Sequence, residues 1–232
     1  MPLFFCALSY SQTSDASNEK QCIYRLLALH STHPKFGYNL EHKRIKAKDL
    51  TEREKEQLYD VATDLFECED YGELFFTDTA TTVAEIFDEA EDINRFKKLH
   101  GICIDYISLL QGKGSSEQAV IANNFKAIKS KALLFNKGEQ IPVISVHQIA
   151  EQKKEQAEES GKYDFNFLSD TSEAKKSSDV VSWILRTEQH RQVHELSWGI
   201  NKVRDSDGVG NTYSLFEDFQ HMRVQLIDTE IE

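Results

Sequence analysis

The sequence predicts an α/β protein in which a mostly parallel sheet is flanked by helices and continues into an antiparallel extension. Two observations predict this class. Up to residue 148, strand-like apolar runs alternate with amphipathic helices, whereas the segment 179–226 contains strand-like runs in succession. With 232 residues, of which 40% are hydrophobic, the chain is long enough to bury a full core.

The most informative strand lies in the apolar run 99–110, which is interrupted by one carboxylate, Asp105. Such a run, bounded by glycine, is typical of a strand buried on both faces. Asp105 then falls at the carboxyl end, where open α/β sheets bind ligands and where acidic side chains hold Mg²⁺ near phosphates. The alternative is an aspartate that caps the next loop. A further buried strand is expected over 141–148, and other strands over 2–8, 74–76, 179–185, 196–203, 213–216 and 222–226.

Two capping boxes mark the starts of helices, Thr51 with Glu54 and Thr82 with Glu85. A short amphipathic helix should end near 33–34, the segment 35–50 carries little pattern, and 150–162 is either helical or mobile. The helix after Thr82 should bury Val83, Ile86, Phe87, Ala90, Ile93 and Phe96 on one face. A helix over 117–136 should bury Val120, Ile121, Phe125, Ile128, Leu133 and Leu134.

Composition excludes several classes of protein. The four cysteines lie far apart without a C-x-x-C pair, which indicates reduced thiols in a cytosol-like compartment rather than a zinc knuckle or a disulfide framework. The sequence contains no apolar segment long enough to span a membrane and no basic leader at its start. The net charge of −12 argues against non-specific coating of nucleic acid, so any such contact should be local.

Histidine pairs and acidic runs are interpreted as surface features. His30 with His33, and His190 with His194, have spacings that could bind a metal, but no third ligand of suitable spacing accompanies either pair. The acidic runs at 67–70 and 88–92 are interpreted as solvated helix faces or ends.

Six segments, taken in order, resemble the DnaB-like replicative helicases, whose ATPase domain is RecA-like. The run from Gly101 to Leu109 resembles the Walker B strand of that family. The other similar segments are 2–11 (the strand after the P-loop helix), 49–51 and 77–86 (connecting helices), 142–148 (the sensor strand), 168–170 with 178–181 (after the DNA-binding loop) and 201–204 (the K-x-R pair). The resemblance covers nearly the whole chain.

The resemblance implies a role for each matched residue. Asp105 would bind Mg²⁺ through water, and Gln148 would sense the γ-phosphate. Lys202 and Arg204 stand two apart on a strand, so both should point the same way and could reach a neighbouring subunit's nucleotide, as an arginine finger does. The alternatives are a loop-capping amide for Gln148 and a solvated strand end for the basic pair.

The sequence also departs from the family. The G-x-x-x-x-G-K-[ST] motif of the P-loop does not occur in these 232 residues. Leu8 or Ser9 stands where the family has the glutamate that polarises water, Ser108 where it commonly has glutamine, and His147 where it commonly has serine. We therefore expect no ATP hydrolysis by the chain alone unless another polypeptide supplies the missing strand, loop and helix.

Residues 1–232 are thus predicted to form one incomplete RecA-like domain that lacks the P-loop strand and helix, with 1–110 reaching the Walker B run and 111–232 holding the sensor strand, the DNA-loop region and the K-x-R strands. A missing central strand would leave neighbouring strand edges unpaired. Three explanations are considered, in order of preference: a split helicase, a degenerate subunit among active copies, and a truncated gene.

Candidate contacts to single-stranded DNA are Lys113 in the loop 111–116, Lys153 and Lys154 in the segment 151–167, and the pair Lys175 and Lys176. Glutamates interleave with the lysines of 151–167, so a solvated helix is the favoured alternative there.

The function implied by the resemblance is that of a component of a DnaB-like replicative helicase. Such a ring-shaped oligomer would use ATP and Mg²⁺ to translocate on single-stranded DNA, with a P-loop-bearing half or subunit and a primase or loader as partners, without a membrane, in the cytoplasm of a bacterial or phage-infected cell. The alternatives are a non-catalytic RecA-like remnant that binds DNA or a replication partner, and a RecA- or KaiC-type ATPase.

Overall fold

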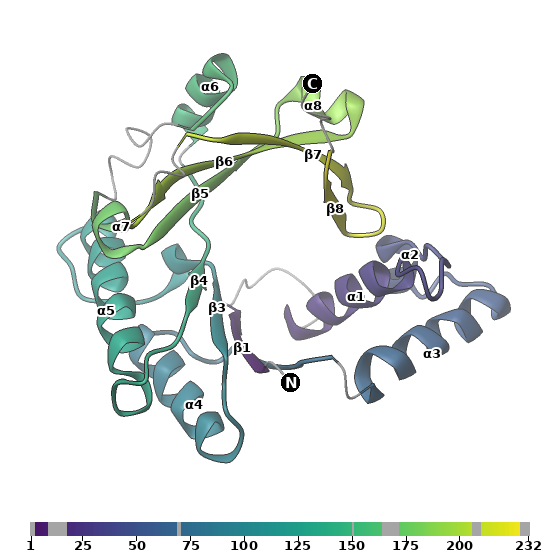
Figure 1. Ribbon diagram of the computed structural model, residues 1–232, viewed down its shortest axis with the longest axis horizontal. Helices are drawn as coiled ribbons and strands as arrows, with labels where there is room; N and C mark the ends of the chain where they lie inside the picture. Colours follow the sequence, from purple (N-terminus) through teal and green to yellow (C-terminus); the bar gives the residue numbers. More distant parts are fainter. Residues whose placement is uncertain are drawn as a thin grey trace.

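The computed structural model contains two four-stranded sheets, one parallel and one antiparallel, with helices around them (Figure 1). It describes residues 3–8, 18–68, 71–149, 151–163, 172–205 and 210–227, with the backbone alone at 3–8, 18, 151 and 152. The predicted α/β class, with a parallel sheet followed by an antiparallel one, is confirmed. None of the described helices combines the length and apolarity needed to cross a membrane.

The parallel sheet has the strand order β2-β1-β3-β4, and each neighbouring pair runs in the same direction. Its strands are β1 (Leu3–Leu8), β2 (Glu73–Thr77), β3 (Gly101–Asp105) and β4 (Val143–Ser145). In β3 the residues Ile102 and Ile104 are 1% exposed, whereas Asp105 at the end is exposed. The predicted central strand with a carboxylate at its carboxyl end is therefore confirmed.

The antiparallel sheet has the order β5-β6-β7-β8 and forms a layer of its own beyond β4 (Figure 1). Its strands are β5 (Val180–Leu185), β6 (Glu195–Val203), β7 (Thr212–Asp218) and β8 (Arg223–Leu226). Each of them overlaps a predicted strand, because each carries an apolar, β-prone run that can be recognised locally.

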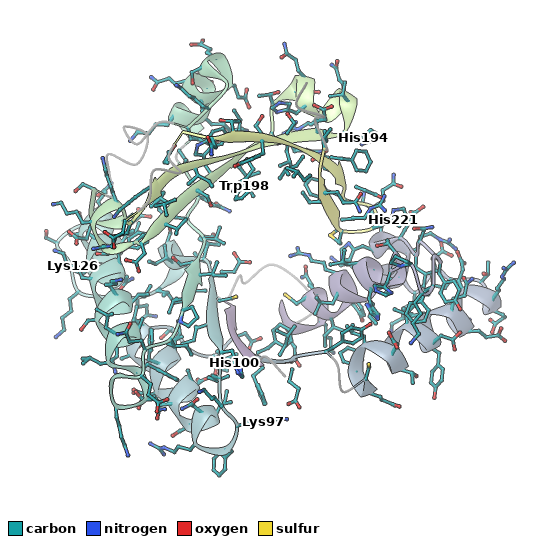
Figure 2. All side chains as sticks on the ribbon, viewed as in Figure 1. Lys97, His100, Lys126, His194, Trp198 and His221 are labelled. Carbon is teal, nitrogen blue, oxygen red and sulfur yellow. The ribbon has the colours of Figure 1, made fainter. Side chains whose placement is uncertain are left out.

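Helices form two groups. The first group packs on itself around Leu27, Leu40 and Val61, and contacts the antiparallel sheet where the His42 N–H donates to the Gln220 carbonyl at 2.8 Å, beside His221 (Figure 2). It consists of α1 (Asn18–Ser31), α2 (His42–Ala47) and α3 (Glu52–Glu67). The second group comprises α4 (Val83–Phe96), the 3₁₀ turn η1 (Ile107–Leu109), α5 (Glu117–Gly138), α6 (Glu151–Ser160), α7 (Ser172–Ser177) and α8 (Glu188–Val193).

The main core lies where α4 and α5 cover one face of the parallel sheet. Ile86 and Phe87 of α4 pack with Ile102 and Ile104 of β3, and Phe125 belongs to the same cluster. Both predicted capping boxes are present, since the Thr51 and Thr82 hydroxyls accept from the N–H groups of the glutamates three residues on, and the side chains of those glutamates accept from the threonine N–H groups.

Several local predictions are wrong. The segment 35–50 contains the short helix α2, which lacks an amphipathic signal because it has only six residues. Phe96 is 91% exposed because α4 ends there. Leu133 and Leu134 are exposed, just before Phe135–Lys137 leave helical geometry and turn the chain.

The prediction that 141–148 forms a buried strand is also wrong. The strand β4 covers only Val143–Ser145 and lies at an edge of its sheet, with Ile144 63% exposed and Val146 49% exposed. An apolar run predicts burial by another surface, but the described residues leave this one open.

Replacing Gly199 with alanine should destabilise the antiparallel sheet. Gly199 of β6 lies opposite Trp183 of β5, and a Cβ there would overlap the indole ring. Forcing a methyl group against a rigid, buried ring should lower the free energy of unfolding by about 1–3 kcal/mol, measured by urea denaturation. Thr212→Ala, at the exposed position opposite Gly199 on β7, is the matched control. Equal stability of both variants would contradict this packing.

Candidate site at the sheet edge and the K-x-R strand

Asp105 ends the central strand of the parallel sheet. Because Ile102 and Ile104 are buried in the core while Asp105 is exposed, the carboxylate stands at the solvent boundary of the carboxyl end. The register places Leu8, the last residue of β1, opposite Asp105. The position where the resemblance expects a water-polarising glutamate therefore neighbours Asp105, and it carries a leucine. Ser9, the other candidate for that position, lies outside the described residues.

The segment after β4 stays beside β3 and brings Gln148 to the same edge. The Val146 N–H donates to the Ile104 carbonyl at 3.1 Å, and the Ile107 N–H donates to the Val146 carbonyl at 3.1 Å. Gln148 follows two residues later and is exposed. The structure thus places the predicted residues Asp105 and Gln148 at neighbouring strand ends.

A hydrogen bond between Ser108 and His147 fixes the approach to this edge. The Ser108 hydroxyl lies 2.8 Å from His147 Nδ1, which joins η1 to the segment after β4. The imidazole is half-buried with its ring against Phe125, and burial lowers the pKa of His147 below its ordinary value. These two positions, which depart from the family's usual residues, therefore contact each other.

Lys202 and Arg204 lie at the end of β6, in the other sheet. Both side chains reach the junction between α7 and β5, so the predicted common direction is correct. The Lys202 ammonium donates to the Ser178 carbonyl at 2.7 Å, and Arg204 Nε lies 2.7 Å from the Asp179 carboxylate. Both side chains are held by oxygen atoms of the protein instead of standing in solvent as a plain strand end.

A groove of about 1300 Å³ separates the two sheets. Its walls include β4 on one side and β5 on the other, and Gln148 and Asp179 both line it. Among the strands that the structure describes, β4 pairs with β3 alone and β5 pairs with β6 alone. The groove is therefore bordered by two strand edges that lack partners in this part of the chain. Ile144 and Ile184, each 63% exposed, add apolar surface to it.

The candidate nucleic-acid residues fall on three separate elements. Lys113 is exposed in the loop before α5, and its carbonyl accepts from the Asn123 amide at 2.7 Å. Lys153 and Lys154 are half-buried on α6, a helix that packs through Ala157 against the antiparallel sheet, and the exposed residues Lys175 and Lys176 lie on α7. The structure does not test their role. Residues 9–11 and 168–170, which carry part of the resemblance, lie outside the described residues.

The histidine pairs have structural partners. His30 Nε2 lies 2.8 Å from the Asp64 carboxylate, whose pKa is lowered to about 2 by Lys35 and then by His30. His190 takes part in a capping box with Thr187 at the start of α8. Over the described ranges, no group of three metal-ligating side chains is present.

The exposed Asp105 carboxylate is compatible with a hydrated Mg²⁺ ion. This cation keeps several of its waters and is usually held by one or two carboxylates together with nucleotide phosphates, rather than by an all-protein cage. A single carboxylate at a strand end, open to solvent, supplies what such a site requires of the protein.

Two residues near the K-x-R pair were not identified from the sequence. Asp179 contacts Arg204 and also Lys129 of α5, with 2.6 Å between the Lys129 nitrogen and the carboxylate. Lys129 lies 50 residues from Asp179 in the chain. No local pattern could have connected them.

A parallel sheet with a carboxylate and an amide at neighbouring carboxyl ends, followed by an antiparallel sheet, defines a RecA-like α/β domain. The chain belongs to the DnaB-like helicase C-terminal domain family, whose model matches residues 13–221. This confirms the family that the sequence motifs resemble.

Solved structures share the fold. A DnaB-like replicative helicase, described with its interactions with primase, superposes with a TM-score of 0.72 at 16% identity, covering 97% of this chain and 50% of that one. A separately solved ATPase domain gives a TM-score of 0.72 at 17% identity, covering 97% of this chain and 75% of that one. This chain thus spans half the length of the first of these proteins. A search among curated proteins finds no match.

Proposed function

We propose that this chain is a component of a ring-shaped, DnaB-like replicative helicase that hydrolyses ATP to translocate on single-stranded DNA. The observation that carries the proposal is the placement of Asp105 and Gln148 at neighbouring strand ends of a RecA-like sheet, in a chain of the DnaB-like family. Lys202 and Arg204, two residues apart at the end of β6, supply the basic pair that such a site takes from an adjoining subunit.

Each residue has a defined task in this proposal. The exposed Asp105 carboxylate binds a hydrated Mg²⁺, and the Gln148 amide hydrogen-bonds the terminal phosphate. Lys202 and Arg204 neutralise charge on the phosphates of a neighbouring copy. ATP and Mg²⁺ supply the triphosphate and the charge that these side chains recognise. The proposed contacts to the DNA backbone are Lys113, Lys153, Lys154, Lys175 and Lys176.

The groove between β4 and β5 supports the further proposal that a P-loop segment completes the domain. Two facing strand edges that have no partner among the described strands are suited to receive one more strand between them. A P-loop-bearing segment, on this polypeptide or on another, would join the two sheets and bring its phosphate-binding turn beside Gln148. A primase or loader would act on the assembled ring.

The test compares ATP hydrolysis by this chain alone with hydrolysis after mixing with the polypeptide encoded directly upstream. That reading frame should encode a P-loop and a strand ending in glutamate. We expect the 232-residue chain alone to be inactive, and the mixture to hydrolyse ATP faster when oligothymidylate is added. Binding of DNA without hydrolysis by the mixture would favour the non-catalytic RecA-like remnant instead.

A further inference from the structure

Asp179 joins basic side chains from two elements that are distant in sequence. Its carboxylate lies 2.6 Å from Lys129 Nζ on α5 and 2.7 Å from Arg204 Nε at the end of β6. The Asp179 carbonyl also accepts from the Arg204 N–H at 2.7 Å, which fixes the end of β6 against the start of β5. Arg204 and Lys129 are thereby held on the same carboxylate.

Lys202 directs its ammonium to the same junction. It donates to the Ser178 carbonyl at 2.7 Å and to the Lys175 carbonyl, and Arg204 Nη2 donates to the Lys176 carbonyl at 3.3 Å. These carbonyls belong to the end of α7 and the residue after it. The basic pair therefore holds the last turn of α7 in place.

The charges in this cluster, defined as Lys129, Lys202, Arg204 and Asp179, do not balance. Three basic side chains share one carboxylate, in a protein whose net charge is −12. The pKa of Lys202 is lowered first by partial burial and then by Arg204, with Lys129 adding to the effect. The pKa of Asp179 is lowered chiefly by its bond to Lys129. Basic groups that repel one another would gain from a ligand that carries more negative charge than one carboxylate.

We propose that this cluster is a phosphate-binding site in which Lys129 is a third cation beside Lys202 and Arg204, and in which Asp179 and the α7 carbonyls compete with the phosphate for these cations. The inference rests on the proposed function only for the role of Lys202 and Arg204. The ligand class is a polyphosphate or phosphodiester oxyanion, since arginine and lysine bind such oxygens through charge-assisted hydrogen bonds.

Competition couples phosphate binding to α7. When phosphate oxygens take over Lys202 and Arg204, the carbonyls of Lys175, Lys176 and Ser178 lose their donors, and the last turn of α7 loosens. Thermodynamic linkage requires the reverse as well, so that anything that holds α7 in place weakens phosphate binding. The cluster would thus report phosphate occupancy to the helix that carries Lys175 and Lys176.

The first experiment titrates the 232-residue chain with inorganic tripolyphosphate by calorimetry. Asp179→Asn should tighten binding about three- to fivefold, because it removes a competing charge at an exposed position, and Lys129→Gln should weaken binding by a similar factor. Lys126→Gln is the matched control, because Lys126 lies one turn earlier on α5 (Figure 2) and pairs with Glu173 instead. Unchanged affinity in both test variants, or weaker binding by Asp179→Asn, would overturn the proposal.

A second experiment follows hydrogen exchange of residues 172–178. Saturating tripolyphosphate should speed exchange there in the wild type, whereas slower or unchanged exchange would overturn the competition. Repeating the titration with ATP and with oligothymidylate identifies the source of the phosphate, since the variants should alter affinity for the ligand that uses the cluster. These readouts need no ATP turnover, so failure of the helicase proposal in the mixing experiment would leave them interpretable.

Discussion

Replacing Arg204 with alanine should reduce DNA-stimulated ATP hydrolysis of the completed assembly by about 10³-fold or more. A guanidinium that stabilises negative charge on a neighbour's phosphates in the transition state contributes far more to the rate than to assembly. The measurement is steady-state hydrolysis with oligothymidylate, alongside size-exclusion chromatography to show that the ring still forms. Lys202, on the same strand, should not substitute, because an ammonium lacks the forked donor geometry of arginine.

The control for this variant is Arg191→Ala. Arg191 lies on α8 and pairs with Glu188 of the same helix, so it takes no part in the contacts at the end of β6. This variant should leave hydrolysis unchanged. If Arg204→Ala retained the wild-type rate in an intact assembly, Arg204 would not act on the neighbour's nucleotide.

Replacing Ile144 with aspartate should prevent completion of the domain and abolish hydrolysis by the mixture. Ile144 is 63% exposed on the edge strand β4 and lines the groove, so a charge there costs the isolated chain little. An inserted strand would cover that charge, and burying an unpaired carboxylate is strongly unfavourable. The loss should be visible as a failure of the upstream polypeptide to co-elute with this chain.

Leu134→Asp serves as the control for this substitution. Leu134 is 68% exposed on α5 and is not among the residues that line the groove. Both variants should fold with similar midpoints in thermal denaturation. Co-elution that survives Ile144→Asp would show that the groove does not receive the P-loop segment.

Local signals predicted much of the fold. The capping boxes at Thr51 and Thr82 and the apolar run that ends at Asp105 each depend on neighbours in sequence, and the structure confirms all three. The exposure of β4 could not be predicted this way. Ile144 and Val146 look like core residues in the sequence, and their exposure depends on which strand lies beside them.

The candidate site shows the same division. Strand ends predicted the place of Asp105 and Gln148, and the two-residue spacing predicted the shared direction of Lys202 and Arg204. The contacts that hold these residues link distant segments. Ser108 and His147 are 39 residues apart in the chain, and neither position suggested the other until the sheet brought them together.

The central claim is that residues of two copies of this chain meet at one nucleotide site. The most direct measurement mixes two inactive variants, Asp105→Asn and Arg204→Ala, in equal amounts with the P-loop-bearing polypeptide. If Arg204 serves a neighbour's site, an interface between intact Asp105 from one copy and intact Arg204 from the next is functional, and random mixing makes about a quarter of the interfaces so. We predict that the mixture recovers DNA-stimulated hydrolysis well above either variant alone. A mixture as inactive as its components, with assembly intact, would contradict the claim.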